Sequence, residues 1–254
     1  MKLYISPCPN DTFMFDALVN GRIDTEGLDL EVSYFDIEEL NSRAISCEAE
    51  FSKISCAIIP QIANNYTISR SGAALGRGNG PLFVKRKGDN SPIKRIAIPG
   101  LHTTANLLIS KLFPEITERT PMLFSTIATA IENNEVDAGV LIHEGRFLYA
   151  QRNLELVADL GVLWEAHTSL PLPLGAIAIR KDVDAQTADK FQRLLAKSIE
   201  FAFANPSLSR NYIKQHAQEM EDSVIDSHIA LFVNEYSREL GTEGYRAIEE
   251  LSKP

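Results

Sequence analysis

Asp137-Ala138-Gly139-Val140-Leu141-Ile142-His143-Glu144-Gly145-Arg146-Phe147 is an apolar run that stops at a histidine and then turns polar. Residues 140–142 predict a short buried strand. His143 then lies at the carboxyl end of a strand, which in open α/β sheets is the edge where ligand crevices form. Histidine suits proton transfer near neutral pH, although a lone histidine at a strand end is more often a hydrogen-bonded structural residue.

Outward from this stretch, short strand-like runs alternate with helix-like periods, which is typical of an α/β protein. Asp11 or Thr12 is expected to cap the first helix. We expect strands at residues 3–5, 28–34, 55–59, 82–84, 95–98, 121–124, 139–142, 154–159 and 176–179. We expect helices at residues 13–19, 37–46, 105–112, 127–133, 185–203, 208–218, 224–236 and 242–251, the last four following one another without a strand between them.

The order of these elements predicts two α/β lobes. Residues 1–87 form the first lobe, to which residues 176–254 return, and residues 88–175 form the second. The two crossings, near residues 86–92 and at the proline-rich residues 171–175, would form a hinge. A chain that leaves one lobe and returns to it has the plan of a two-lobe, periplasmic-binding-protein-like (type II) fold, with the ligand cleft between the lobes. The glycine-rich residues 72–80 favour a turn between β-segments over a nucleotide loop, because Pro81 and a strand follow them.

Composition limits the classes of function. The chain has 254 residues, 44% hydrophobic and 23% charged, with a formal net charge of -9, so nucleic acid is not an expected partner. Cys8, Cys47 and Cys56 show neither paired nor zinc-ligand spacing, which favours a reducing cytoplasm over a disulfide framework. The sequence contains no signal-peptide core and no apolar run long enough to cross a membrane. We therefore expect a cytoplasmic protein with a small-molecule ligand, whose oligomeric state is not readable from the sequence.

Two polar turns could face the cleft at helix N-termini. In the first, Asn10 and Asp11 could present side chains to a ligand, although a plain helix cap is the likelier interpretation of the spacing alone. In the second, Thr103 and Thr104 add hydroxyls to the free amides of a helix N-terminus, which favours a carboxylate or another anion. Capping is an equally good interpretation of the threonine pair.

Two further groups complete the candidate site. Ser52, Lys53 and Ser55 offer a positive charge and hydroxyls at a turn that leads into the strand at residues 55–59; an exposed lysine beside turn-forming serines is the default alternative. His143 is followed by Glu144, which would raise the pKa of the imidazole, and by Arg146, which would lower it and is a further candidate contact to a ligand.

The remaining histidines and cysteines carry weaker signals. His102 is a second donor beside the threonine pair, and His167 could line the cleft near the hinge. His216 and His228 lie in C-terminal helices and are expected to be structural. No histidine pair has the HExxH spacing of a catalytic zinc site, so no metal is expected. Cys8 has no local histidine partner, which makes a thiolate nucleophile a minor alternative.

Five motifs together resemble the 1,4-dihydroxy-6-naphthoate synthases of the futalosine route to menaquinone. They are Ser6-Pro7-Cys8-Pro9-Asn10-Asp11-Thr12-Phe13, Ser71-Gly72-Ala73-Ala74-Leu75-Gly76-Arg77-Gly78, Pro99-Gly100-Leu101-His102-Thr103-Thr104, Ile142-His143-Glu144-Gly145-Arg146-Phe147 and Leu170-Pro171-Leu172-Pro173-Leu174-Gly175-Ala176. The resemblance runs in order along the whole chain. It implies a periplasmic-binding-protein-like fold and a cofactor-free lyase that converts cyclic dehypoxanthine futalosine to 1,4-dihydroxy-6-naphthoate.

The resemblance also assigns roles to residues. It implies that His143 is the proton acceptor and that Thr103-Thr104 and residues 52–55 contact the substrate. Gly145 departs from the serine expected after the glutamate. The hypothesis is that His143 removes an activated C–H proton, that a carbon–carbon bond then breaks to expel the ribose-derived part, and that aromatisation drives the reaction. A non-catalytic solute-binding protein and chorismate dehydratase, the sister enzyme with the same fold, are the alternatives; the lack of a signal peptide argues against the first and the N-terminal turn against the second.

Overall fold

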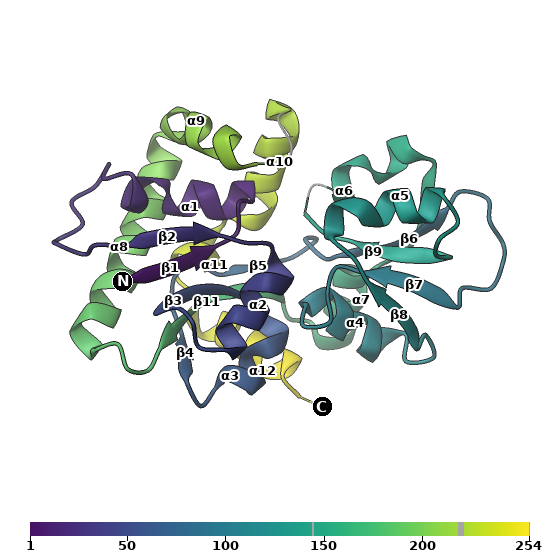
Figure 1. The fold of residues 1–254 in the computed structure, drawn as a ribbon, viewed down its shortest axis with the longest axis horizontal. Helices are drawn as coiled ribbons and strands as arrows, with labels where there is room; N and C mark the ends of the chain where they lie inside the picture. Colours follow the sequence, from purple (N-terminus) through teal and green to yellow (C-terminus); the bar gives the residue numbers. More distant parts are fainter. Residues whose placement is uncertain (144, 218–220, 254) are drawn as a thin grey trace.

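The computed structural model describes residues 1–143, 145–217 and 221–253. Glu144, expected beside the base, lies outside the described residues. The chain forms two α/β lobes side by side, each built on its own sheet (Figure 1). The first sheet has the order β2-β1-β3-β11-β4, with β5 pairing along β11. Its strands are β1 (Lys2–Ile5), β2 (Glu31–Tyr34), β3 (Phe51–Ser55), β4 (Tyr66–Ile68), β5 (Ala74–Gly76) and β11 (Leu172–Arg180).

The second sheet has the order β10-β6-β9-β7-β8. It consists of β6 (Leu82–Arg86), β7 (Arg95–Ile98), β8 (Glu118–Pro121), β9 (Ala138–Leu141) and β10 (Leu154–Asp159). Both sheets are mixed: β1 is parallel to its neighbours β2 and β3, and β7 is parallel to β8 and β9, whereas β11, β6 and β10 run antiparallel to their partners. The parallel strands of both sheets end at the cleft side, where the loops of the two lobes meet.

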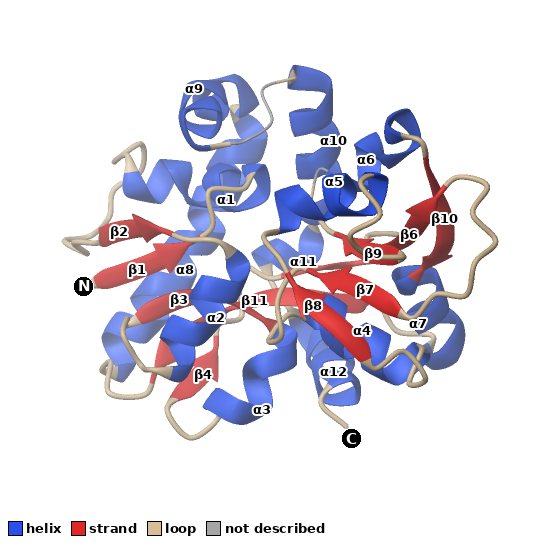
Figure 2. Cartoon of the chain, turned by 45° about the vertical axis from the view of Figure 1, so that its right-hand side comes forward, coloured by secondary structure: helices blue, strands red, loops and turns tan. Residues whose placement is uncertain are grey.

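Helices cover both sheets (Figure 2). Those of the first lobe are α1 (Pro9–Val19), α2 (Ile37–Ile45), α3 (Ile59–Ile62), α8 (Ala185–Ala204), α9 (Pro206–His216), α10 (Asp222–Phe232), α11 (Glu235–Arg238) and α12 (Gly241–Leu251). Those of the second are α4 (Thr104–Leu112), α5 (Ile127–Glu132), α6 (Gly145–Leu148) and α7 (Leu160–Thr168). Short 3₁₀ turns are also found among the described residues: η1 (Cys56–Ile58), η2 (Phe124–Thr126) and η3 (Tyr149–Arg152). Among the described residues, no helix combines the length and apolar character needed to cross a membrane.

Helix α1 is buried along most of its length because it packs against α8, α9 and α10 as well as the first sheet. The apolar core of the first lobe includes Phe15, Phe51 and Phe191, with the last two rings stacked 3.9 Å apart. This packing fixes the N-terminus of α1, which carries Asn10 and Asp11, against the strands that face the cleft. A second apolar cluster takes side chains from both lobes, including Leu75 and Trp164, so the lobes share part of their core.

The division between lobes differs from the expected one at its first crossing. The expected boundary at residue 87 put residues 82–86 in the first lobe, but β6 is hydrogen-bonded between β9 and β10 in the second sheet. The chain therefore crosses in residues 77–81, within the glycine-rich segment, because a strand–turn–strand pattern does not reveal which sheet each strand joins. The return crossing precedes Leu172, which pairs with Gly76, so the two crossings lie side by side.

Three predicted elements were wrong. Residues 56–59 form η1 and the start of α3 instead of a strand, because Pro60 occupies the first turn of α3 and a short apolar run fits either structure. Residues 122–124 follow β8 and lead into η2. The expected connection at residues 171–175 is mostly strand: Pro173 is accommodated in β11 at a register shift opposite β5, the irregularity where a strand tolerates proline.

Candidate active site

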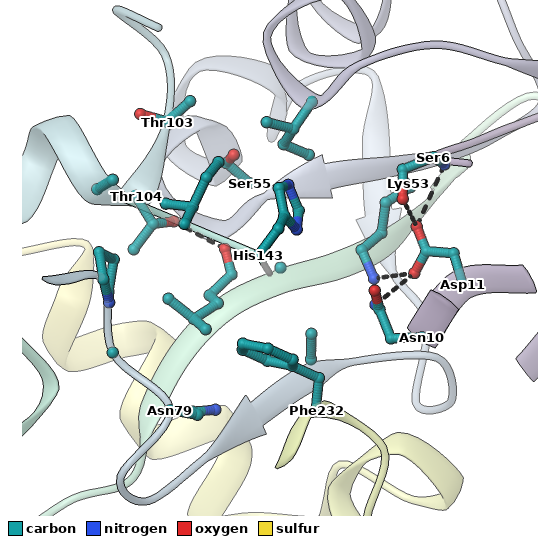
Figure 3. Close-up of a pocket in the computed structure, with 18 of the residues that line it drawn as sticks. Ser6, Asn10, Asp11, Lys53, Ser55, Asn79, Thr103, Thr104, His143 and Phe232 are labelled. Atoms are coloured by element: carbon teal, nitrogen blue, oxygen red, sulfur yellow. Dashed lines mark hydrogen bonds and ion pairs between the residues drawn. The ribbon is translucent and has the colours of Figure 1, made fainter. Parts of the chain in front are cut away.

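A cavity between the two lobes collects most of the candidate residues (Figure 3). The first lobe contributes Asn10, Asp11, Lys53 and Ser55. The second contributes Thr103, Thr104, His143 and Arg146. Residues far apart in the sequence thus meet where the loops at the strand ends of both sheets face each other, as expected for a ligand site in this architecture.

Ser52 is the exception among the candidates. Residues 51–55 are strand β3 itself instead of a turn, so Lys53 and Ser55 point to one face and Ser52 to the other. The Ser52 side chain is fully buried and its hydroxyl donates to the carbonyl of Lys53. Its role is therefore internal to the first lobe in this structure.

His143 lies two residues after the end of β9 and two residues before α6, and it faces the cavity. Its φ is +53°, in the left-handed region that non-glycine residues seldom occupy. The ring makes an edge contact with Phe124 at 4.8 Å between centroids, and its Nε2 lies 3.8 Å from Sγ of Cys8. The sequence showed no histidine near Cys8, because the partner is 135 residues away.

The environment of His143 favours the neutral imidazole. Part of the His143 side chain is accessible because it faces the cavity. The ring nevertheless lies deep within the protein, away from bulk water. Desolvation lowers the pKa of His143 from 6.5 to about 4, against an opposing effect of the negative charge on Asp11. At neutral pH the ring therefore has a free lone pair, which a general base requires.

Asp11 is buried at the centre of a polar network. It was expected as a helix cap, but α1 begins at Pro9 and the N-cap position is Cys8, because proline is suited to the first turn of a helix. The Asp11 carboxylate instead accepts from the amide and the hydroxyl of Ser6, at 3.2 and 2.7 Å, and from Nδ2 of Asn10 at 2.9 Å. It also pairs with Lys53 Nζ at 2.6 Å (Figure 3).

The Asp11–Lys53 pair sets the charge of the cavity wall. Both side chains are almost fully buried, so each charge requires the other. An ammonium has three donors, and within the described residues only the one to Asp11 is used in a hydrogen bond. Lys53 can therefore still donate to a bound anion while Asp11 balances its charge.

The threonine pair forms the N-terminus of α4. Thr103 is the N-cap: its hydroxyl accepts from the amide of Asn106 at 3.2 Å and donates to the carbonyl of Gly100 at 2.8 Å. Thr104 donates to the carbonyl of Leu174 at 2.8 Å and accepts from the amide of Ala57 at 3.3 Å, which ties the two lobes together. Both hydroxyls thus have partners. Within the described residues the amides of Thr104 and Ala105 have none, so they are the groups open to an anion.

Arg146 lines the cavity from α6, but its guanidinium is held by the protein. It donates to the carbonyl of Gly80 and pairs with Asp159 at 3.1 Å. Arg146 therefore anchors the segment that crosses between the lobes, and Asp159 in turn caps α7.

Several site residues were missed in the sequence. His228 and Phe232, both on α10, line the cavity, and so does Asn79 from the first crossing. Asn41 on α2 donates to the Ser55 hydroxyl at 2.9 Å and to the carbonyl of His102 at 3.2 Å. The four-residue spacing of His228 and Phe232 puts both on one helix face, but nothing in the local sequence indicates that this face meets a cleft.

His102 and His167 do not line this cavity. His102 Nδ1 lies 2.7 Å from Oε1 of Glu38 across the lobe boundary. His167 is exposed near the end of α7, where its Nδ1 contacts the carbonyl of Leu163, and it borders a separate surface depression. Among the described residues, no three His, Cys, Asp or Glu side chains gather in an arrangement that could hold a metal ion.

A family model described as menaquinone biosynthesis matches residues 1–253. The chain belongs to the menaquinone biosynthesis family. Two curated relatives are named 1,4-dihydroxy-6-naphthoate synthase, which confirms the resemblance seen in the motifs. The one from Thermus thermophilus is 41% identical, over 99% of this chain and 92% of its own length. The one from Streptomyces coelicolor is 39% identical, over 99% of this chain and 91% of its own length. This member of the menaquinone biosynthesis family is therefore an enzyme of that pathway.

Solved structures confirm the fold. A crystal structure of an Archaeoglobus fulgidus protein matches with a TM-score of 0.93 and 36% identity, covering 98% of this chain and 94% of that one. The ligand-binding component of an ABC-type import system from Staphylococcus aureus matches with a TM-score of 0.71 and 14% identity, covering 99% of this chain and 90% of that one. A Candida albicans protein described as having the generic periplasmic binding protein fold matches with a TM-score of 0.69 and 12% identity, covering 99% of this chain and 89% of that one. This enzyme of the menaquinone biosynthesis family thus has a periplasmic-binding-protein-like fold.

Proposed function

We propose that this enzyme is a lyase that converts cyclic dehypoxanthine futalosine to 1,4-dihydroxy-6-naphthoate, with His143 as general base. The observation that carries the proposal is the position of the His143 imidazole, which faces the interlobe cavity. Burial lowers the pKa of this ring to about 4, so it is neutral at pH 7. The names of the two curated relatives support the same reaction.

The reaction begins when His143 removes the activated C–H proton of the bound substrate. The electron pair left on carbon becomes a new double bond as a carbon–carbon bond breaks. The ribose-derived part leaves with the bonding pair and is protonated, and the new naphthalene ring becomes aromatic. His143 carries the proton as an imidazolium, and the nearby negative charge of Asp11 favours that form. Each turnover ends when the imidazolium returns its proton to solvent or product.

The substrate carboxylate binds at the N-terminus of α4. The free amides of the first turn, the helix dipole and the spare donors of Lys53 together favour a negative charge there. Because these groups come from both lobes, substrate binding and lobe closure support each other, which holds the C–H bond against the imidazole and excludes water.

The direct test is product formation by the purified protein. Incubation with cyclic dehypoxanthine futalosine, with and without EDTA, is followed by mass-resolved chromatography. We expect 1,4-dihydroxy-6-naphthoate in both samples. Substrate that is bound but recovered unchanged would contradict the lyase and favour a binding protein.

The role of His143 is tested with His143→Ala and His143→Asn. General-base catalysis contributes about 10²–10⁴ in rate, so we expect kcat to fall by that order while substrate affinity, measured by calorimetry, stays within a few-fold. His167→Asn is the matched control, because His167 is exposed and outside the cavity. A His143 variant that keeps near-normal turnover would overturn the assignment.

A further inference from the structure

His228 is a second buried histidine in the cavity, with no role in the mechanism above. It lies on α10, is 1% exposed, and lines the cavity beside His143. The two imidazoles are close to parallel, with an interplanar angle of 20° and 6.0 Å between ring centroids. A molecule that presents a C–H bond to His143 therefore lies within reach of His228.

A chain of hydrogen bonds fixes the proton on His228. The Asp11 carboxylate only accepts, so Asn10 must turn its Nδ2 toward it, as observed at 2.9 Å. The Asn10 oxygen is then the atom that faces Nε2 of His228, at 3.2 Å, and this oxygen only accepts. Nε2 must carry the hydrogen, which leaves Nδ1 as an unprotonated acceptor. Burial and the neighbouring His143 and Lys53 lower the pKa of His228 well below its usual value, so the ring is neutral.

Within the described residues, Nδ1 of His228 is buried and has no hydrogen-bond partner. Leaving a buried polar atom unpaired costs the free energy of its lost hydration, so native proteins seldom do so without a functional reason. The rest of the ring is fully engaged by Asn10, His143 and Phe232, which holds the unpaired nitrogen in place.

We propose that Nδ1 of His228 accepts a hydrogen bond from a substrate hydroxyl and so positions the substrate against His143. The donor belongs to the ribose-derived part, because an aryl carboxylate offers only acceptors at neutral pH. His228 is thus a positioning and specificity residue. It hydrogen-bonds the sugar-derived hydroxyl, whereas the N-terminus of α4 and Lys53 bind the carboxylate. The inference rests on the proposed function for the identity of the ligand.

Two substitutions distinguish the contributions of Nδ1 and Nε2 of His228 to substrate binding. In His228→Asn the amide oxygen lies near the position of Nδ1 and can still accept, whereas in His228→Gln the amide lies near Nε2 and preserves only the contact to Asn10. Both are made in the His143→Asn background, and binding of cyclic dehypoxanthine futalosine is measured by calorimetry. We expect His228→Gln to weaken binding about tenfold and His228→Asn to weaken it less. His167→Gln is the control.

Deoxy analogues of the substrate identify the contact. Each analogue lacks one hydroxyl of the ribose-derived part. We expect one of them to bind equally well to the His143→Asn protein with and without His228→Gln, because that analogue cannot donate the hydrogen bond to Nδ1 of His228. In addition, nitrogen NMR of the imidazole should show the Nε2–H form in the free protein and a shift of the Nδ1 resonance when substrate binds, which a purely structural histidine would not give.

The outcomes are separable from those of the proposed function. Equal losses for the intact substrate and every deoxy analogue, or an Nδ1–H form in the free protein, would overturn the role of His228 even if product forms. Failure of the unmutated protein to form product would overturn the lyase, while the binding experiments would still decide whether His228 holds a hydroxyl. Absence of any binding would overturn both.

Discussion

The backbone of His143 is held in a conformation that its side chain disfavours. A non-glycine residue with φ of +53° costs on the order of 1–3 kcal/mol, and such strain concentrates at functional sites. The cost is met by the rigid elements on either side, since β9 ends at Leu141 and α6 begins at Gly145. The turn aims the imidazole into the cavity at the expense of stability.

The two His143 variants should therefore differ in stability. Asparagine enters the left-handed region more readily than alanine, so we expect His143→Asn to be more stable than His143→Ala by up to about 1 kcal/mol. Urea unfolding of both variants measures the difference. If His143→Ala were the more stable, the turn would not be strained in the way described.

The lowered pKa of His143 also predicts pH dependence. Between pH 6.5 and about 4 the unfolded chain binds a proton that the folded protein does not. The stabilising contribution of the neutral ring is thus complete above pH 6.5 and is lost as the pH falls toward 4, by at most about 3 kcal/mol. The base likewise remains unprotonated, so the acid limb of kcat/KM should lie well below 6.5. A limb at or above 6.5 in the pH–rate profile would contradict a buried neutral base.

At the residue scale, several residues that the sequence singled out line the cavity between the lobes. His143 and the α4 N-terminus stood out because each follows an apolar run, and Lys53 stood out as a charge just before the apolar residues 56–59. His228 and Asn41 could not, because their contacts depend on how remote helices pack. The spacing alone favoured Asp11 as a helix cap over a ligand contact, but Pro9 shifts the helix start, and Asp11 is instead the buried partner of Lys53.

Among the elements, the antiparallel pair β3–β11 holds Lys53 in position. Gly175 of β11 is opposite Ser55 of β3, and a Cβ at Gly175 would lie 2.9 Å from the carbonyl oxygen of Ile54 and 3.1 Å from Cε of Lys53. The lysine stem therefore runs directly over the space that a side chain at Gly175 would fill.

Gly175→Ala should consequently displace either β3 or Lys53. Overpacking of this kind costs about 1–3 kcal/mol, and loss of the Lys53 contact should raise KM. Gly145→Ala is the matched control, since a Cβ there meets only Leu141 at an ordinary 3.5 Å. Thermal unfolding and steady-state kinetics of both variants provide the measurement, and equal effects would argue against the special role of Gly175.

Element prediction failed where local patterns were ambiguous. Long amphipathic helices such as α8 were found to within a residue or two, because their apolar period extends over five turns. Short apolar runs beside prolines were not, because residues 56–59 and 171–175 fit a strand, a turn or a helix equally well until their neighbours are known.

On the scale of the whole molecule, Glu38 connects the lobes. Its carboxylate accepts from the amide of His102 at 3.0 Å and contacts Nδ1 of the His102 imidazole at 2.7 Å. These contacts hold α2 of the first lobe against the loop before α4 of the second. Gly100, with φ of +148°, permits this approach, because a Cβ there would lie 2.3 Å from Glu38 Oε2.

Glu38→Ala should shift the enzyme toward an open form. The pair is partly exposed, so the effect is modest: we expect KM to rise several-fold at nearly constant kcat and the radius of gyration without ligand to increase in small-angle scattering. Glu39→Ala is the control, because Glu39 pairs with Arg43 on the same helix. The role of the Glu38–His102 contact would be contradicted if the radius of gyration increased in Glu39→Ala, or if it did not increase in Glu38→Ala.

The two-lobe plan itself could be predicted, because the last four predicted helices follow one another with no strand among them. The first crossing could not be placed, since only strand pairing shows that β6 joins the second sheet. Hinge motion at these crossings stays a prediction. Small-angle scattering of Glu38→Ala offers a first test of it.

The place of β11 has a consequence for synthesis on the ribosome. This strand lies between β3 and β4, yet it is translated about a hundred residues after them. Until it emerges, the nascent chain carries two open strand edges on an unfinished sheet, while the second lobe already has all its strands. Chains that end before residue 172 and have been released from the ribosome should thus contain a protease-resistant second lobe joined to an N-terminal segment that depends on chaperones for protection.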